Sequence, residues 1–292
     1  MYNTNKGSVN MSQKSYDNSP TLYLIPTPIG NLDDITLRAI NTLKSVSVVF
    51  CEDTRITRQL LTHLGISKKL IASHKFNEEM NSDKLLEFLN NGQDVGLVTD
   101  RGTPIISDPG YELVKVAITN NYNVVSLPGP TAFVPALTVS GLSPQPFLFY
   151  GFLNNKNSKR EKELESLKDY PFTMIFYEAP HRIVETLESM EKVLGNKNIC
   201  ISREISKRYE EVYRGKISEI IKDMSDVKGE LVVVVDGNHD EKTYDNLSII
   251  EHVNLYIING HDKKDALKLV AKDRGISKSD VYKEYHRGDL WN

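Results

Sequence analysis

The chain has 292 residues, of which 39% are hydrophobic and 26% are charged. These ordinary values exclude a disordered, collagen-like or coiled-coil protein, and at roughly 150 residues per domain the length predicts two domains. The formal net charge of −3 excludes a nonspecific polycation. It does not exclude a nucleic-acid partner, because basic patches can exist within a nearly neutral total.

Residue counts and missing motifs exclude several further classes. The two cysteines, Cys51 and Cys200, form no C-x-x-C pair, and the seven histidines have no ligand-like spacing, so we expect no disulfide framework and no bound metal. The dinucleotide fingerprint, the P-loop, H-E-x-x-H and G-x-S-x-G are all absent. No apolar run approaches the length of about 18 residues expected of a membrane span. Residues 1–20 lack the apolar segment of a secretory signal, so we expect a disordered extension of a cytoplasmic protein.

From residue 21 to residue 150, short β-branched runs alternate with helical patterns. Strands are expected at residues 22–25, 46–51, 94–99, 123–127 and 147–150. Helices are expected at residues 36–43, 54–64, 83–90, 110–119 and 131–139. This alternation predicts βαβ units and a mostly parallel sheet, hence an α/β domain over residues 21–150.

The second block, residues 151–237, contains more strands and fewer helices. Strands are expected at residues 172–177, 199–201, 209–213 and 231–235, and helices at 156–167, 182–193 and 217–224. This pattern predicts a second, mixed α+β domain. Residues 238–246 resemble a polar linker, and the rest of the segment 238–292 has helical patterns only.

Nine of the twelve prolines lie between Pro26 and Pro146, and most of them directly follow a predicted strand. Turns with proline and glycine occur at residues 26–31, 100–104, 108–110 and 128–132. Open α/β sheets bind ligands beyond the carboxyl ends of their strands. Any one of these turns could be simple loop punctuation, but four of them at successive strand ends favour a ligand site.

Eight short motifs occur in unbroken order between residues 21 and 236. They are Leu-Tyr-Leu-Ile-Pro-Thr-Pro-Ile-Gly-Asn-Leu at 22–32, Cys-Glu-Asp-Thr-Arg at 51–55, Asp-Arg-Gly-Thr-Pro at 100–104, Ile-Ser-Asp-Pro-Gly-Tyr at 106–111, Pro-Gly-Pro-Thr-Ala at 128–132, Phe-Tyr-Glu-Ala-Pro-His-Arg at 176–182, Arg-Glu-Ile-Ser-Lys at 203–207 and Gly-Glu-Leu at 229–231. Together they resemble the ribosomal RNA small subunit methyltransferase I family of the tetrapyrrole methylase superfamily.

The resemblance implies an enzyme that uses S-adenosylmethionine to methylate the ribose 2′-hydroxyl of a cytidine in the decoding region of 16S rRNA. It implies the small ribosomal subunit as partner, a homodimer, and no membrane or metal. The implied fold is that of a class III methyltransferase, with two α/β domains, a cofactor cleft between them and a small C-terminal helical region that touches RNA.

The turns at the strand ends supply the expected cofactor site, since glycine allows close approach and proline fixes a turn. Asp100 could accept hydrogen bonds from the cofactor, and the resemblance adds Phe176 or Tyr177, with core packing as the alternative role for Phe176. The candidates are Pro28, Gly30, Asp100, Gly102, Thr103, Pro104, Gly129, Thr131, Ala132 and Phe176. Arg101 stands where the family usually has alanine, and we expect it to point outward toward RNA phosphate.

A ribose hydroxyl is a very weak acid, so its methylation needs a base or a group that orients it. The candidates are Glu52, Asp53, Glu178 and His181, which follow predicted strands in tight polar sets. Asp53 could instead cap the next helix, and His181 could be structural. The sequence leaves the base unassigned.

RNA contact needs local positive charge. The candidates are Arg55, Arg101, Lys159, Arg160, Arg182, Arg203, Lys207 and Arg287. In the tail, Tyr282, Tyr285, His286 and Trp291 lie among basic residues and could stack on bases, or the helix could simply present a solvated face.

Two other functions stay open at this stage. One is a small-molecule methylase of the same superfamily that acts on a tetrapyrrole. The other is a catalytically silent RNA-binding or assembly protein in which Arg101 has spoiled the cofactor loop.

Overall fold

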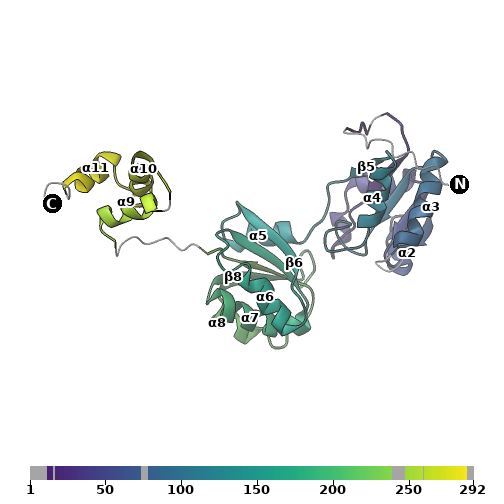
Figure 1. Cartoon of the computed structure of the whole chain (residues 1–292). Coiled ribbons are helices and arrows are strands. Elements are labelled where there is room, and N and C mark those ends of the chain that lie inside the picture. The colour runs from purple at the N-terminus through teal and green to yellow at the C-terminus, as the bar shows by residue number, and fades with distance from the viewer. Residues whose placement is uncertain (1–11, 16, 74–77, 239–246, 259, 288–292) are drawn as a thin grey trace. The chain divides into compact units, whose positions relative to one another are not determined.

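The computed structural model describes residues 12–15, 17–73, 78–238, 247–258 and 260–287. The chain divides into two compact units, Met1–Asn238 and His239–Asn292 (Figure 1). The first unit contains two five-stranded sheets, and the described part of the second is helical.

The first sheet is entirely parallel, with the strand order β3-β2-β4-β1-β5. Its strands are β1 (Thr21–Leu24), β2 (Val48–Cys51), β3 (Lys69–Ala72), β4 (Val95–Val98) and β5 (Asn123–Ser126). The connections contain η1 (Leu32–Asp34), α1 (Leu37–Ser45), α2 (Thr54–His63), α3 (Glu78–Asn90) and α4 (Tyr111–Thr119). The side chain of Thr36 caps α1 and that of Asp53 caps α2, because each accepts a hydrogen bond from a backbone N–H in the first turn of the helix.

The loops that follow β1 and β4 are joined to each other. Thr27 and Gly102 exchange two backbone hydrogen bonds of 2.9 and 3.0 Å in an isolated antiparallel bridge. The Thr27 hydroxyl also donates to the carbonyl of Thr99. Two loops that are far apart in sequence therefore form one fixed floor at the carboxyl edge of the sheet.

The second sheet has the order β6-β7-β10-β8-β9, and only the β6–β7 pair is parallel. Its strands are β6 (Phe147–Phe152), β7 (Thr173–Glu178), β8 (Asn198–Arg203), β9 (Glu211–Lys216) and β10 (Leu231–Val235). Helix α5 (Phe133–Ser140) packs on one face of the sheet. The other face is covered by α6 (Asn157–Glu165), α7 (Ile183–Leu194) and α8 (Ile217–Ile220), with the short turns η2 (Pro180–Arg182) and η3 (Ile221–Asp223) beside them (Figure 1).

Several element predictions need correction. The domain boundary expected at residue 150 falls within β6. The sequence assigned α5 and β6 to the first domain, but β6 is a strand of the second sheet and α5 packs on that sheet. Strand β3 was not predicted, because it is a short, half-exposed edge strand without alternation. The strand expected at 209–213 lies at Glu211–Lys216, and the helix expected at 217–224 divides into α8 and η3.

The N-terminal extension is partly described. Residues 1–11 and 16 lie outside the described residues, and so does the linker segment 239–246. The side-chain amide of Gln13 both donates to and accepts from the backbone of Val124 on β5. This part of the extension therefore pairs with the edge of the first sheet.

The C-terminal unit is a cluster of α9 (Ile249–Ile258), α10 (Lys263–Asp273) and α11 (Lys278–Arg287). Its core contains Val253, Leu267, Val270 and Val281. In the part of the chain that the structure describes, no helix combines the length and hydrophobicity of a membrane span. The same residues contain no group of three or more His, Cys, Asp or Glu side chains arranged to hold a metal ion.

Candidate active site

A pocket of about 460 Å³ lies where the carboxyl edge of the first sheet meets one end of the second. The loops after β1, β2 and β4 form one wall, and the ends of β6, β7 and β10 form the other. Because β10 is antiparallel to β7, Leu231 lies beside Glu178, and the start of β10 reaches the same edge as the end of β7. The volume falls in the range of roughly 300–1,000 Å³ typical of small-molecule sites.

Hydrogen bonds hold the polar side of this pocket in place. The Asp100 carboxylate accepts the backbone N–H of Asp53 at 3.0 Å, and the Thr99 hydroxyl donates to Glu52 at 3.2 Å. The Thr103 hydroxyl donates to the carbonyl of Pro130 at 2.9 Å. The loops after β2, β4 and β5 are thus tied together through their own side chains.

The loop after β4 is also strained. Ile105 and Ser107 have φ angles of 77° and 66°, and Gly102 has 83°. A β-branched residue in the left-handed region is an outlier that costs on the order of 1–3 kcal/mol. Residues Ile106 to Asp108 line the pocket, so the strained turn directs this segment toward the cavity.

Five acidic residues line the pocket, namely Glu52, Asp100, Asp108, Glu178 and Glu230. Burial raises the pKa of Asp108 to about 7, with Glu52, Asp100 and Glu230 adding to the rise. Burial also raises the pKa of Asp100, against the hydrogen bond from Asp53. Crowded carboxylates of this kind favour a positively charged ligand.

Basic residues at the edge of the pocket are paired with one of these acids. Arg101 forms an ion pair of 2.6 Å with Glu230, and Lys207 binds Glu230 at 3.1 Å and Glu204 at 2.8 Å. The Lys207 side chain also crosses Gly30, where a Cβ would collide with it. A larger residue at position 30 would therefore force the Lys207 side chain to move.

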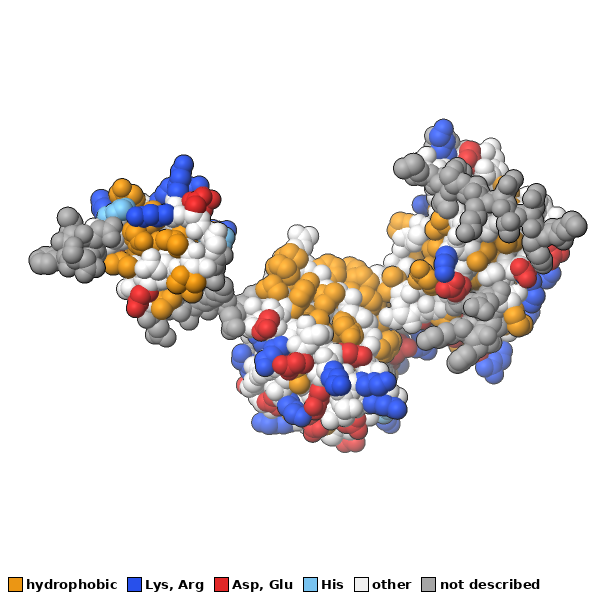
Figure 2. Space-filling view, in the orientation of Figure 1, with side chains coloured by type: hydrophobic (Ala, Val, Ile, Leu, Met, Phe, Trp, Pro, Cys, Tyr) orange, Lys and Arg blue, Asp and Glu red, His pale blue; other side chains and the backbone are white. Residues whose placement is uncertain are grey.

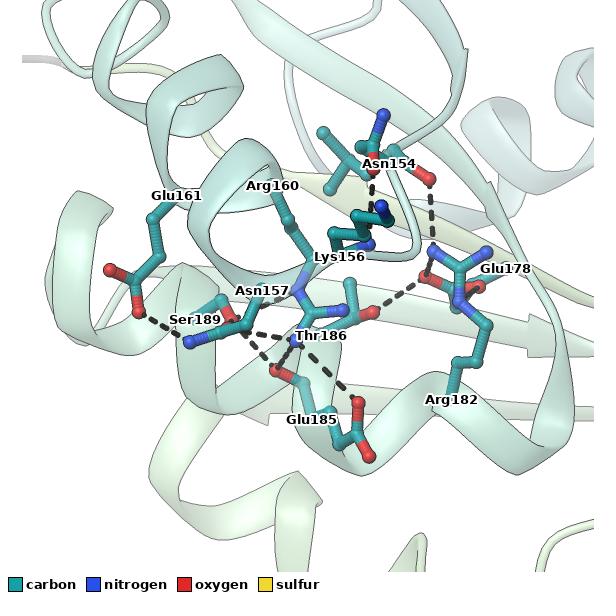
Figure 3. Close-up of polar contacts among 11 residues, drawn as sticks. Asn154, Lys156, Asn157, Arg160, Glu161, Glu178, Arg182, Glu185, Thr186 and Ser189 are labelled. Carbon is teal, nitrogen blue, oxygen red and sulfur yellow. Dashed lines mark hydrogen bonds and ion pairs between the residues drawn. The ribbon is translucent and has the colours of Figure 1, made fainter.

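Glu178, at the end of β7, is fully buried and surrounded by donors (Figure 3). Its carboxylate accepts from the Thr186 hydroxyl at 2.6 Å and from the backbone N–H of Ala179 at 2.8 Å. Arg182 forms an ion pair with it at 3.4 Å and donates to the carbonyl of Leu153 at 2.9 Å. Glu178 and Arg182 thus connect the ends of β7 and β6.

Arg160, expected to contact RNA, is only 1% exposed, so that prediction is wrong. Its guanidinium lies under α7, where it donates to Ser189 at 3.0 Å, to Asn157 at 3.0 Å and to the carbonyl of Glu185 at 3.2 Å (Figure 3). The charge pattern of α6 gave no sign of this, because the buried arginine sits among exposed lysines and glutamates.

Replacing Arg160 by alanine should therefore destabilise the fold rather than weaken RNA binding. The change removes the buried hydrogen bonds from the guanidinium to Ser189, Asn157 and the carbonyl of Glu185, and we expect a loss of about 2–4 kcal/mol in the free energy of unfolding. Urea denaturation measures it. The neighbouring Lys159→Ala, at an exposed position, is the matched control and should change stability by less than about 0.5 kcal/mol. Equal stabilities of the two variants would contradict the burial.

The structure gathers eight of the sequence-predicted residues at the pocket. These are Glu52, Asp100, Arg101, Gly102, Thr103, Thr131, Ala132 and Glu178. Phe176 is not among them, because β7 points it into the core on the opposite face, against Tyr150. Its neighbour Tyr177 lines the pocket instead, and burial raises the pKa of the Tyr177 phenol.

The remaining candidates lie around the pocket. Pro28 and Pro104 are buried in the loops, and Gly30 and Gly129 line two neighbouring hollows. Asp53 caps α2 and pairs with Arg55, which holds the pKa of its carboxyl at about 2. His181 is exposed in η2.

Three contributors were missed by the sequence analysis, namely Asp108, Glu230 and Phe152. Asp108 and Glu230 fall within quoted motifs, and the clustering of Asp-Pro-Gly after a strand was a usable signal for Asp108. Phe152 had no such signal, because its position depends on an irregularity in β6.

The family described as Tetrapyrrole (Corrin/Porphyrin) Methylases matches residues 21–221. The chain belongs to this family. Among its relatives, "Ribosomal RNA small subunit methyltransferase I" of Bacillus subtilis is 46% identical over 273 residues, which are 91% of this chain and 94% of that protein. The protein of the same name from Escherichia coli O157:H7 is 38% identical, over 92% of this chain and 96% of that one.

Solved structures of other proteins share the fold. Uroporphyrin-III-C-methyltransferase from Thermus thermophilus has a TM-score of 0.54 at 18% identity, and covers 74% of this chain and 94% of its own. A diphthine synthase has a TM-score of 0.58 at 14% identity, and covers 74% and 90%. At these identities the likeness concerns the fold, which is the class III methyltransferase arrangement that the sequence predicted.

The cofactor of the tetrapyrrole methylase family is S-adenosylmethionine, and the pocket fits it. A sulfonium cation and an ammonium group suit this acidic lining, and Asp100 is the residue that would hold them. Ile29, Tyr177 and Leu231 offer apolar walls for an adenine ring. A Cβ at Gly102 would lie 3.3 Å from the Ile29 side chain, so the glycine leaves room in the floor of the pocket.

Proposed function

We propose that this protein methylates the ribose 2′-hydroxyl of a cytidine in the decoding region of 16S rRNA, with S-adenosylmethionine as methyl donor. The observation that carries the proposal is the match, over more than nine-tenths of the chain, to relatives named ribosomal RNA small subunit methyltransferase I. A ribosomal substrate implies a cytoplasmic protein.

The chemistry assigned to the chain's residues follows from the pocket. The bound cofactor supplies an electrophilic methyl group. Asp108 accepts the proton of the attacking hydroxyl, because a carboxyl with a pKa of about 7 is partly ionised at neutral pH and is a stronger base than an ordinary aspartate. Asp100 stays in its hydrogen bond to Asp53 and contributes negative charge. Glu178 is fully engaged by its neighbours, and we assign it a positioning role.

The best test is methyl incorporation into 30S subunits from a strain that lacks the modification, followed by nucleoside mapping. We expect one labelled 2′-O-methylcytidine in the decoding region. Label at a base, label in another rRNA region, or no label would each reject the proposal. The tetrapyrrole alternative predicts instead methylation of a tetrapyrrole and none of the subunit.

The silent-protein alternative supposed that Arg101 spoils the cofactor loop. Its guanidinium is engaged with Glu230 at the edge of the pocket, which favours an intact cofactor site. Calorimetry with S-adenosylhomocysteine tests this point, since an active methylase should bind the product below millimolar concentration. Absence of binding would favour the silent protein.

RNA contacts are proposed for the basic candidates that remain accessible. Arg55 and Arg287 are highly exposed, and Lys159 is exposed at the start of α6. Arg182, Arg203 and Lys207 are mostly covered by their ion pairs, and we propose that they bind phosphate only at the edge of the pocket.

Replacing Arg101 by alanine should leave S-adenosylhomocysteine affinity unchanged and weaken binding of 30S subunits. One lost phosphate contact should also reduce the salt dependence of binding by about one unit in the log–log slope. Calorimetry gives the first quantity and filter binding at several salt concentrations the second. A large gain in cofactor affinity would contradict the outward role of Arg101.

We also propose that the enzyme is a homodimer joined through α5 and β6. Hydrophobic side chains gather over these elements (Figure 2), among them the exposed Val134, Val139 and Phe147. Strand β6 is also an unpaired sheet edge within the described chain, which proteins commonly cover. Sedimentation should give a dimer for the wild type and a monomer for Val134→Lys. The control Ile118→Lys, on α4, should stay dimeric.

A further inference from the structure

Phe152 is a large aromatic side chain that is exposed at the pocket. It lines the pocket and yet is 52% exposed, so one part of its ring faces the cavity and another faces solvent. Ile56 and Ile106, which come from the segments after β2 and β4, also line the cavity and are also exposed. An apolar rim of this kind is costly in water unless a ligand covers it.

An irregularity in β6 turns Phe152 toward the pocket. The pairing with β7 runs Phe149 to Ile175 but Gly151 to Phe176, so Tyr150 is an extra residue and the register shifts by one. Gly151 has a φ of +83°, the left-handed conformation typical of a glycine bulge. Without the bulge, alternation would point Phe152 away from the face of Phe149. With the bulge, Phe152 pairs with Tyr177 and shares its face.

The re-aimed ring is held by its surroundings. Its centroid lies 5.6 Å from that of Tyr177 in an edge-to-face contact. The next residue, Leu153, has its carbonyl bound by Arg182, which is itself held by Glu178. Gly151 lies against the strained loop of the first sheet, because a Cβ there would be 3.1 Å from the Ser107 hydroxyl. The ring therefore has an aromatic partner on one side, and the backbone on either side of Phe152 is fixed.

We propose that Phe152, together with Ile56 and Ile106, is the platform on which the base of the acceptor nucleotide lies, unstacked from its RNA. This inference rests on the proposed function, since a ribose whose hydroxyl meets the pocket carries its base to the rim. Proteins that recognise single-stranded RNA stack splayed bases on aromatic rings. The positive charge of Lys159, which is exposed on the helix that follows β6, complements the phosphates of such a nucleotide.

The test compares Phe152→Ala with Phe152→Trp and with Phe172→Ala. Phe172 is an exposed phenylalanine just before β7, outside the pocket, and so is the matched control. For Phe152→Ala we expect kcat/KM on 30S subunits to fall about 10- to 100-fold, the effect of one lost base stack. Binding of subunits in the presence of S-adenosylhomocysteine should weaken in parallel. Phe152→Trp should keep activity within about threefold, and Phe172→Ala should match the wild type.

Two further measurements separate the possible failures. Calorimetric affinity for S-adenosylhomocysteine should stay within about twofold in every variant, and a loss in Phe152→Ala would assign the ring to the cofactor instead. Sedimentation should leave the oligomeric state unchanged, and a monomeric Phe152→Ala would assign the ring to an interface between copies. Wild-type methylation with equal rates for Phe152→Ala and Phe172→Ala would reject this inference alone. Absence of wild-type methylation would reject the proposed function.

Discussion

Asp108→Asn should lower kcat on 30S subunits by at least about 100-fold, because removal of a general base typically costs 10²–10⁴-fold. In the wild type, kcat/KM should rise with pH and level off above about 7, as the Asp108 carboxyl loses its proton. The variant has no such group, so its residual rate should show no step near neutrality. Rates measured from pH 5.5 to 8.5 check both expectations.

The matched control is Asp53→Asn. Asp53 is outside the pocket, and asparagine can replace it as the cap of α2. Its rate and its pH profile should resemble those of the wild type. If Asp108→Asn kept the wild-type rate, the base would have to be sought among the other pocket carboxylates, beginning with Glu52.

The same carboxyl links stability to pH. Its pKa in the folded protein is about 7, against an ordinary 3.8, so between these values the folded state holds more protons than the unfolded state. Asp108 therefore lowers stability as pH rises from about 4 to about 7. Asp108→Asn should melt above the wild type at pH 8, and the difference should vanish near pH 4. Thermal midpoints of the two proteins are measured across this pH range. Parallel curves of midpoint against pH would falsify the assignment of the raised pKa to Asp108.

Glu178→Ala should cause the largest loss of stability, about 3–5 kcal/mol in the free energy of unfolding. The substitution leaves the mostly buried Arg182 guanidinium without its carboxylate and also removes the acceptor of Thr186. Urea denaturation measures the loss. Glu178→Gln retains shape and one acceptor and should lose less.

A second substitution identifies the cause. Adding Arg182→Met to Glu178→Ala removes the unpaired charge, so the double variant should recover part of the lost stability. If the double variant were simply the sum of two losses, the ion pair would not be the source of the effect.

The parallel sheet could be predicted because its strands are continuous apolar runs between helices. Strands β1, β2, β4 and β5 were located within a few residues, and β10 was located at its observed bounds. Strand β3 was missed because an edge strand buries only part of each side chain, so Lys69 and Ala72 carry no apolar pattern.

The sequence predicted the position of the candidate site in the fold better than it predicted which side chains line it. Proline and glycine turns located the loops after β1, β4 and β5, since backbone geometry is visible in residue type. The direction in which a side chain points is not visible in residue type. Arg160 and Phe176 turned out to be buried, and the position of Phe152 depends on one extra residue in β6. The raised pKa of Asp108 likewise depends first on burial in the folded chain and then on carboxylates from distant segments, notably Glu52 and Glu230.

The packing of α5 on the second sheet has a consequence for synthesis of the chain. Its buried residues Ala136 and Leu137 rest against strands that include β10, which ends at Val235. Because β10 is the central strand that joins β7 to β8, this apolar surface is not fully covered until β10 emerges. At about 5–20 residues per second, synthesis from the end of α5 to the end of β10 takes roughly 5–20 s. The second sheet is therefore completed late, and during that interval part of its apolar surface is open to chaperones and to aggregation.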